Sequence, residues 1–248
     1  MQVKNFLSLI VLLILVSSCA IYGPQPPTEV KAGENDFNSR MEKGIQHLNL
    51  GELEKALGEF QKALAINPKS ARANNLSGIA YFQQKNYRAA EKMFKIATSL
   101  NPSYAEAWNN LGSVSFIQKD FDQAIKMFKK ALFLEPDSLS ANYSLGYLLI
   151  SQGQAEEGTT YLSRGIGLDP DFLEKHKSFV SVLAIPASET PQVYFAYAEA
   201  YAARGNVDKV VEYLTKAKNA GFRDWQRIAT EKEFEKVRED IRIKEVIR

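Results

Sequence analysis

The sequence predicts an all-α repeat protein that follows a short N-terminal leader. The main observation is a period: Pro68, Pro102, Pro136 and Pro170, four of nine prolines, are spaced 34 residues apart. Small and aromatic residues keep the same spacing through residues 37–172, and a fixed period of this length indicates stacked helical units. The composition agrees, because 248 residues that are 45% hydrophobic and 24% charged suit a globular chain with a sizeable core.

The composition also excludes several classes of function. Lys plus Arg is 31 and Asp plus Glu is 29, so the net charge of +2 gives no electrostatic reason to expect a nucleic-acid binder. The single cysteine, Cys19, excludes a disulfide framework and a cysteine-based zinc site. The two histidines, His47 and His176, lie far apart in sequence, which disfavours a histidine-based metal centre. We therefore expect neither a metal nor a cofactor.

The first element is a leader, residues 1–18. Lys4 precedes an apolar run over residues 6–16, which is too short to cross about 30 Å of hydrocarbon but suits a secretory signal. Residues 16–19, VSSC, then resemble the lipobox of bacterial lipoproteins. The resemblance implies cleavage before Cys19, with lipid on its sulfur and on its new amine. An ordinary signal peptide, or an uncleaved anchor with an incidental cysteine, is the alternative.

A lipidated terminus would decide where the protein resides. One acyl chain anchors only marginally, but three chains on Cys19 would hold the protein on a membrane almost permanently. Ala20 stands where such lipoproteins carry Asp when they stay in the inner membrane, so the resemblance implies an outer-membrane lipoprotein facing the periplasm. Residues 19–36 then form a flexible tether, because they carry three Pro and two Gly with little apolar periodicity.

Four repeats follow, at residues 37–70, 71–104, 105–138 and 139–172. Glycine holds the eighth position of each, and an aromatic or Leu side chain holds the twenty-fourth. The eighth-position residues are Gly44, Gly78, Gly112 and Gly146, and those at the twenty-fourth are Phe60, Phe94, Phe128 and Leu162. The third copy, with Trp108, Leu111, Gly112, Phe121, Ala124, Phe128, Ala131 and Pro136, closely resembles the tetratricopeptide repeat (TPR).

This resemblance implies a right-handed superhelical solenoid of antiparallel helix pairs. Each helix would have about 14 residues, roughly 21 Å at 1.5 Å per residue. No pair can bury its apolar face alone, so the pairs stack. The fourth repeat departs from the pattern, because Gly158 and Gly165 replace alanine. Each glycine inside a helix costs about 1 kcal/mol against alanine, so we expect this repeat to be looser.

Three segments complete the chain. Residues 173–190 break the period and are predicted as an inserted helix and loop. Residues 191–221 resume it as a degenerate fifth repeat. Residues 222–248 are predicted as C-terminal capping helices, because a solenoid needs its open end covered. Within them, Thr230 followed by Glu233 has the pattern of a capping box that begins a helix. The alternative is that this tail binds a partner.

In TPR proteins the first helix of each repeat lines a concave groove. Carrying the groove positions over predicts a neutral, partly apolar surface with amides at Asn75 and Asn109. Such a surface suits an extended peptide or a helix of another protein. Some of these residues could instead pack against neighbouring helices or the tail. The predicted groove residues are Met41, Ile45, Arg72, Asn75, Ile79, Phe82, Glu106, Asn109, Ser113, Phe116, Tyr143 and Tyr147.

No catalytic pattern accompanies the repeats. The chain lacks a GxSxG elbow, a P-loop, an HExxH pair and an EF-hand loop, so we expect no enzymatic activity and no small-molecule substrate. The carboxylate clamp of heat-shock chaperone TPR domains is also missing. Its cationic and amide positions here hold Met41, Ile45, Ile79, Glu106 and Asn110. Binding of a C-terminal EEVD-like tail is therefore not expected.

These observations together predict a membrane-anchored scaffold that binds other proteins of the cell envelope. It resembles repeat lipoproteins that act as adaptors for cell-wall enzymes. It equally resembles the pilotins that help to assemble type IV pilus secretins, and nothing in the residues separates the two. A homo-oligomer whose tail fills its own groove is a further possibility.

Overall fold

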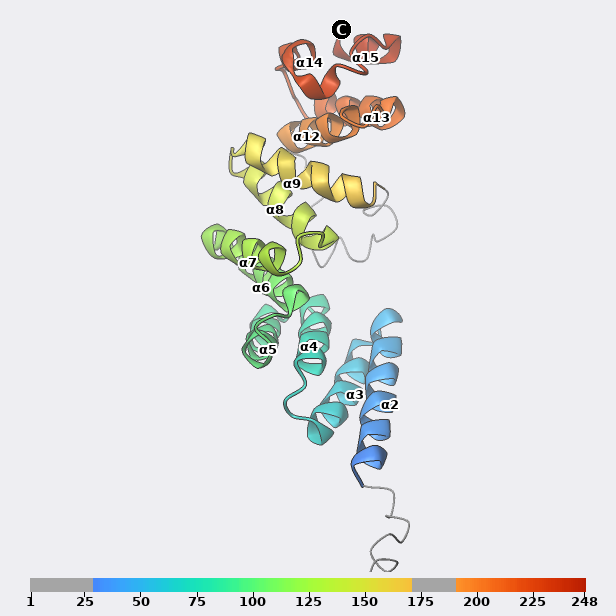
Figure 1. The fold of residues 1–248 in the computed structure, drawn as a ribbon, viewed down its shortest axis with the longest axis vertical. Helices are drawn as coiled ribbons and strands as arrows, with labels where there is room; N and C mark the ends of the chain where they lie inside the picture. The colour runs from blue at the N-terminus through green and yellow to red at the C-terminus, as the bar shows by residue number, and fades with distance from the viewer. Residues whose placement is uncertain (1–28, 171–190) are drawn as a thin grey trace, which may run out of the picture.

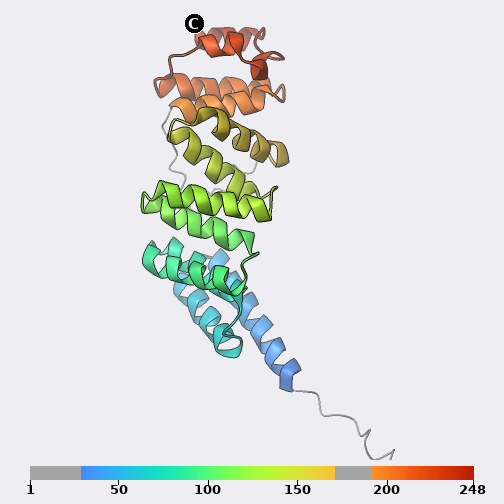
Figure 2. The ribbon, with the colours of Figure 1, turned by 60° about the vertical axis from the view of Figure 1, so that its left-hand side comes forward.

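The structure, a computed structural model, describes residues 29–170 and 191–248 (Figure 1). The predicted leader (1–18), Cys19 with most of the tether, and the predicted insertion (173–190) lie outside the described residues. The described elements are all helices, and they stack as consecutive pairs along one long axis (Figure 2). None of the helices in these two ranges is both long and apolar enough to cross a membrane.

The helix pairs follow the predicted period. Each repeat contributes a first and a second helix that pack against each other, and each second helix contacts the next first helix. The first four pairs are α2 (Glu29–Asn49) with α3 (Leu53–Ile66), α4 (Ala71–Gln83) with α5 (Tyr87–Leu100), α6 (Ala105–Ile117) with α7 (Phe121–Leu134), and α8 (Leu139–Ser151) with α9 (Ala155–Leu168).

One of these helices begins earlier than predicted. Helix α2 starts at Glu29, so residues 29–36 are helical and do not belong to a tether as expected. The tether prediction rested on the weak apolar periodicity of this stretch. The reason is local: after Pro27 the segment contains no further proline and has good helix formers, so it can extend the helix that Met41 and Leu48 anchor in the core.

Glycine at the eighth position lets the two helices of a pair approach closely. In the first three repeats, the ring at the twenty-fourth position lies directly on this glycine. A Cβ atom added to Gly78 would lie 2.5 Å from Cε1 of Phe94. The rings of Phe60, Phe94 and Phe128 are fully buried as a result. The periodic residues of the sequence are therefore the contact residues of the fold.

The fourth pair uses glycine for a different contact. A Cβ on Gly158 would lie 2.7 Å from the carbonyl oxygen of Gly146, so here the two backbones touch. Gly165 faces the ring of Tyr143, where a Cβ would lie 3.1 Å from Cε2. We expected these glycines to loosen the repeat. The structure also gives them a packing role, because they make room for close helices and for a tyrosine, while the expected looseness stays a prediction.

The turn inside each pair requires a left-handed backbone at the fifteenth position. Gly51 and Gly153 supply it with φ of 73° and 82°. Lys85 and Lys119 hold the same conformation with φ of 61° and 63°, which costs a residue with a Cβ roughly 1–2 kcal/mol. Gly205 takes this place in the fifth pair, with φ of 73°, which sets the register of that repeat from residue 191.

The fifth pair and the tail close one end of the stack. Helices α12 (Pro191–Ala202) and α13 (Val207–Asn219) form the pair, and α12 packs on α9 and α8. The tail forms α14 (Gln226–Thr230), the short 3₁₀ turn η1 (Lys232–Phe234) and α15 (Ile241–Ile247). Its apolar side chains Phe222, Ile228, Phe234, Val237 and Ile243 are buried in one cluster with α12 and α13.

The tail therefore covers the last pair, but not with the helix start that was predicted. Thr230 is the last residue of α14, and its Oγ1 donates to backbone carbonyls within that helix. The capping-box interpretation of Thr230 and Glu233 is wrong. The cap that does form lies further along, where the Asp240 carboxylate accepts from the backbone N–H of Arg242 at 2.9 Å and begins α15.

Candidate protein-binding face

Five of the twelve predicted groove residues reach the surface of the first helices. Arg72 and Glu106 are exposed, and Ile45, Ile79 and Phe116 are partly exposed. They come from α2, α4 and α6, at positions two, nine and twelve of their repeats. We call these five residues the first-helix face. It combines one cation, one anion and three apolar side chains, which is a composition suited to a peptide segment.

The other seven predicted residues are buried in the fold. Met41 and Phe82 belong to the apolar clusters of the first and second repeats. Polar and aromatic members are buried as well, which is the outcome foreseen as the alternative for some of them. The full set is Met41, Asn75, Phe82, Asn109, Ser113, Tyr143 and Tyr147.

Asn75 illustrates why a groove position need not be free. Its Nδ2 donates to Tyr104 Oη at 3.2 Å and to Glu106 Oε1 at 3.0 Å, and its Oδ1 accepts from Asn110 Nδ2 at 3.0 Å. Every hydrogen-bonding group of this side chain is thus used between the second and third repeats. Burial, followed by the nearby Glu106 carboxylate, raises the pKa of Tyr104 to about 12, so its hydroxyl stays a donor at neutral pH.

Tyr143 and Tyr147 are buried because the fifth repeat packs on the fourth. Both belong to the large cluster that α12 and α13 complete. The ring of Tyr143 stacks on that of Tyr197 at 6.5 Å between centroids, and its hydroxyl donates to the carbonyl of Asp169 at 3.2 Å. The first-helix face therefore extends over repeats 1–3 and not into repeat 4. Phe116, at 5.9 Å from the Tyr147 ring, marks its end.

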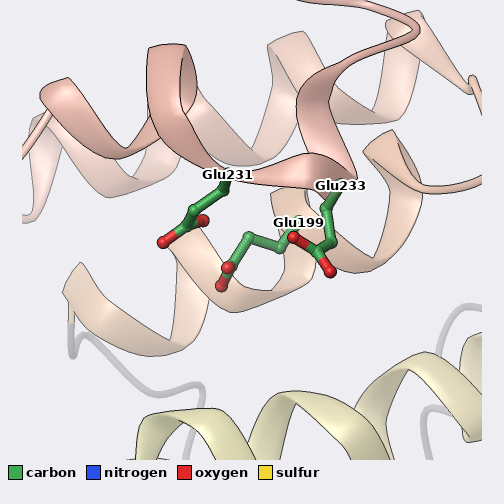
Figure 3. Close-up of side chains that lie close together, drawn as sticks. All are labelled: Glu199, Glu231 and Glu233. Carbon is green, nitrogen blue, oxygen red and sulfur yellow. The ribbon is translucent and has the colours of Figure 1, made fainter.

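A second constellation, which the sequence did not predict, lies between α12 and the tail (Figure 3). Glu199 of α12 faces Glu231 and Glu233, and one carboxylate oxygen of each lies within 4.8 Å of the others. Glu199 Oε1 accepts from Arg227 Nη2 at 3.1 Å, and Arg227 also pairs with Glu231. Burial, and then a hydrogen bond with Glu231, raise the pKa of Glu199 to about 9 against the opposing effect of Arg227.

These carboxylates do not make a convincing metal site. Carboxylate oxygens are ligands that Mg²⁺ and Ca²⁺ prefer. Here, however, the Arg227 guanidinium already pairs with Glu199 and Glu231, and the raised pKa of Glu199 disfavours the charged carboxylate that a metal ion would need. Arg227 lies in addition over the ring of Phe195, 4.5 Å from its centroid. The arrangement fits a polar contact that joins the tail to the last repeat.

Comparisons with known proteins agree with the geometry of the helix pairs. Three family models described as tetratricopeptide repeat match residues 47–112, 105–138 and 139–172. Together they span more than half of the chain. The chain belongs to the TPR family. No curated protein matches the sequence.

Solved structures resemble this TPR chain over most of its length. A crystal structure of MamA protein has 21% identity and a TM-score of 0.51, and covers 80% of this chain and 97% of its own. PilF of Pseudomonas aeruginosa has 18% identity and a TM-score of 0.53, with 81% and 100% covered. At such identities the likeness concerns the fold alone, a stack of TPR helix pairs.

Proposed function

We propose that this TPR protein is a membrane-anchored adaptor that binds segments of other cell-envelope proteins. The observation that carries the proposal is the first-helix face, where Ile45, Ile79 and Phe116 stay partly exposed and Arg72 and Glu106 are exposed. Scattered apolar residues are normal on a surface, but these three lie on the first helices of successive repeats, where Ile45 and Ile79 border one apolar cluster and Ile79 and Phe116 border the next. The resemblance of residues 16–19 to a lipobox supports the membrane anchor.

Position-specific crosslinking tests the binding face. A photoreactive amino acid at Ile79 is expected to give protein adducts in intact cells. The same residue at Lys62, on the exposed side of the second helix α3, serves as the control because it lies on another surface. Adducts at Lys62 alone, or at neither position, would contradict the proposal. Asn75 and Asn109 are unsuitable for this test, because their replacement would disturb the buried contacts between repeats.

Lipid labelling tests the anchor separately. Cells fed a labelled fatty acid are expected to label the full chain, and Cys19→Ser is expected to remove the label. Three acyl chains should also keep the native chain in the membrane fraction through a high-salt wash, because this attachment does not depend on charge. Equal labelling of the variant would show that Cys19 is not lipidated.

A role in type IV pilus assembly is the second candidate. It rests on the same layout of a lipobox-like leader followed by TPR pairs, and on a structural likeness that covers the whole PilF chain. Loss of surface pili after deletion of the gene would favour it over a cell-wall adaptor. Normal pili with altered cell-wall cleavage would favour the adaptor. A homo-oligomer would instead show a mass in light scattering that rises with protein concentration.

A further inference from the structure

The second helices of the second and third repeats carry an excess of positive charge. Helices α5 and α7 each have three cationic residues and one acidic residue. By contrast, α3 has two of each, α9 has one cation and two acidic residues, and α13 has three cations and two acidic residues. The excess lies in consecutive layers of the stack, because α5 and α7 occupy the same place in neighbouring repeats (Figure 1).

Most of these cations have no acidic partner within the described chain. On the two helices only Lys95 and Lys129 form ion pairs, with Glu91 and Glu157. Asp122, the acidic residue of α7, is exposed and is also without an ion pair. Clusters of roughly four to eight Lys or Arg on a helical surface are typical of binding to anionic lipid. The unpaired cations of α5, of α7 and of the turn before each helix are Lys85, Arg88, Lys92, Lys119, Lys126 and Lys130.

Four of the unpaired cations share one side of the helices with an exposed aromatic ring. They hold repeat positions eighteen, twenty-two and twenty-six, and the ring holds position twenty-nine, which is the spacing of a single helical face. This face points away from the first helices, because its residues are exposed or partly exposed while the opposite side is buried. We call it the α5–α7 face, and it consists of Arg88, Lys92, Lys126, Lys130 and Phe133.

Phe133 gives the α5–α7 face an apolar contact beside its charges. The side chain is 78% exposed, and the Lys130 ammonium lies 5.2 Å from the centroid of its ring. A single exposed ring is common on protein surfaces, but a ring among cations is typical of helices that lie in a membrane interface. The same position of the other repeats holds Ala65, Ser99, Gly167 and Asn219.

The surface of α5 is also hollowed on this side. The hollow is open, has a volume of about 480 Å³, and every described residue of its lining belongs to α5. The lining is mainly apolar, because Ile96 and Leu100 contribute to it together with the long stems of Arg88 and Lys92. An apolar floor with cationic ends suits the boundary between acyl chains and phosphate headgroups.

The proposed anchor would keep this face close to a membrane. This step rests on the function proposed above, in which Cys19 carries the lipid. Nine residues, 20–28, separate Cys19 from the start of α2 at Glu29. An extended chain spans at most about 3.3–3.6 Å per residue, so α2 would begin within about 30 Å of the bilayer. Tethering at such a distance gives a high effective concentration, which makes weak contacts with the surface significant.

We propose that the α5–α7 face lies on a membrane surface rich in anionic phospholipid. The lipid phosphates would bind the four cations of the face, and the Phe133 ring would enter the interface between headgroups and acyl chains. The first helices, on the other side of each pair, would then remain open to partner proteins. A broad lipid surface fits this face better than one acidic segment does, because the cations are spread over two layers of the stack.

Vesicle sedimentation tests this proposal. The protein is the unlipidated chain from Ala20 onward, which keeps every residue of the four apolar clusters of the fold. The vesicles contain phosphatidylglycerol and phosphatidylcholine in equal parts. We expect half-saturation on the order of 1 mM lipid at low salt, and binding about tenfold weaker or less to phosphatidylcholine alone or in 0.5 M salt. Failure to bind the anionic vesicles, or equal binding to both kinds of vesicle, overturns the proposal.

Two variants and a matched control make the test specific. The double variant Lys92→Glu and Lys126→Glu should weaken binding about tenfold or more, because it reverses two charges of the face. Phe133→Ser installs the residue of the preceding repeat and should weaken binding about threefold or more. The control, Lys43→Glu with Lys232→Glu, changes the net charge equally at exposed sites elsewhere and should bind within about twofold of the native chain. An equal loss in the control, or no loss in Phe133→Ser, overturns the proposal.

A crosslinking experiment in cells separates a lipid surface from an acidic partner protein. A photoreactive amino acid at Ser99, which holds position twenty-nine of α5, should give adducts with lipid. Adducts with protein alone would assign the face to a partner protein and overturn the proposal. The vesicle assay does not use the anchor, so the two proposals fail separately. Loss of labelling at Cys19 would refute the anchor, and loss of vesicle binding would refute the role of the α5–α7 face.

Discussion

Single atoms decide how closely the helices of a pair can approach. At Gly44, Gly78 and Gly112, the space that a Cβ would need is filled by the ring at the twenty-fourth position. Gly58, by contrast, lies in the middle of α3 with no atom within 4 Å of such a Cβ. Replacement by alanine is thus expected to have opposite effects on stability at Gly78 and at Gly58. Comparing the two distinguishes the effect of side-chain packing from that of helix propensity.

We expect Gly78→Ala to lower the free energy of unfolding by about 1–3 kcal/mol, because the Phe94 ring must move. Gly58→Ala should raise it by about 0.5–1 kcal/mol, since alanine favours a helix and meets no obstacle. Thermal unfolding followed by circular dichroism measures both, at roughly 2–4 °C per kcal/mol for a chain of this size. If both variants shifted in the same direction, the contact with Phe94 would not be what requires glycine.

The Glu199 carboxyl should make stability depend on pH in an unusual direction. Burial raises its pKa above the ordinary value of 4.5, so the folded chain keeps a proton that the unfolded chain releases. This contribution is complete below about pH 4.5 and declines as the pH rises toward 9. Glu199→Gln stays neutral throughout, so its melting temperature relative to the native chain should increase between about pH 5 and pH 8.

The matched control for this measurement is Glu235→Gln, in the same tail but exposed. Its melting temperature should stay at a constant offset from that of the native chain over the same pH range. A constant offset for Glu199→Gln as well would mean that the carboxyl titrates alike in the folded and unfolded chains.

The sequence predicted the contact residues better than the binding residues, and Asn75 shows why. The position of Gly78 and Phe94 in the period fixes their contact, because both partners lie in one repeat. Whether Asn75 is free depends on Tyr104 at the end of its own repeat and on Glu106 and Asn110 of the next repeat, which vary from copy to copy. A rule based on position inside one repeat cannot include these neighbours.

At the scale of helices and turns, the left-handed residue at the fifteenth position ends each first helix. Glycine adopts this conformation without a steric cost, but Lys85 and Lys119 do not. Both lysines are exposed, so their side chains give little packing in return. These two turns therefore store strain that a substitution can remove.

We expect Lys85→Gly and Lys119→Gly each to raise the free energy of unfolding by about 0.5–1 kcal/mol. This gain is smaller than the cost of the left-handed conformation, because glycine loses more backbone entropy than lysine when the chain folds. Lys126→Gly, at an exposed site inside α7, is the control and should lower it by about 1 kcal/mol. Chemical denaturation measures all three. A loss of stability at the turns would show that the lysine side chains matter there.

Other elements escaped prediction for physical reasons. The repeat pattern set the bounds of the helices from Leu53 to Leu168, but the start of α2 at Glu29 lies before the first periodic residue. The tail folds as short helical segments, and these contain too few residues to show a helical period of apolar side chains in the sequence. Its partner is the fifth repeat, so its burial follows from tertiary packing and not from Thr230 and Glu233.

For the whole molecule, a change in the stability of one helix pair should mainly affect the pairs that contact it. Each pair contacts the pair before and the pair after it, and the tail contacts the last pair. The C-terminal cluster is joined through rings, with Phe195 stacked on Phe222 at 4.2 Å and packed on Phe234 at 5.5 Å between centroids. Damage at this end should therefore loosen the adjacent pairs and fade along the stack.

Phe234→Ala tests this local coupling, because Phe234 is fully buried between the tail and α12. The cavity should cost about 3–5 kcal/mol in the terminal unit. Hydrogen exchange followed by mass spectrometry should then show faster exchange in α12, α13 and the tail, and little change in α4 and α5. The control is Ile241→Ser, which alters an exposed side chain of the same tail and should leave exchange unchanged. Faster exchange spread evenly from α3 to α13 would instead show that the solenoid unfolds as one cooperative unit.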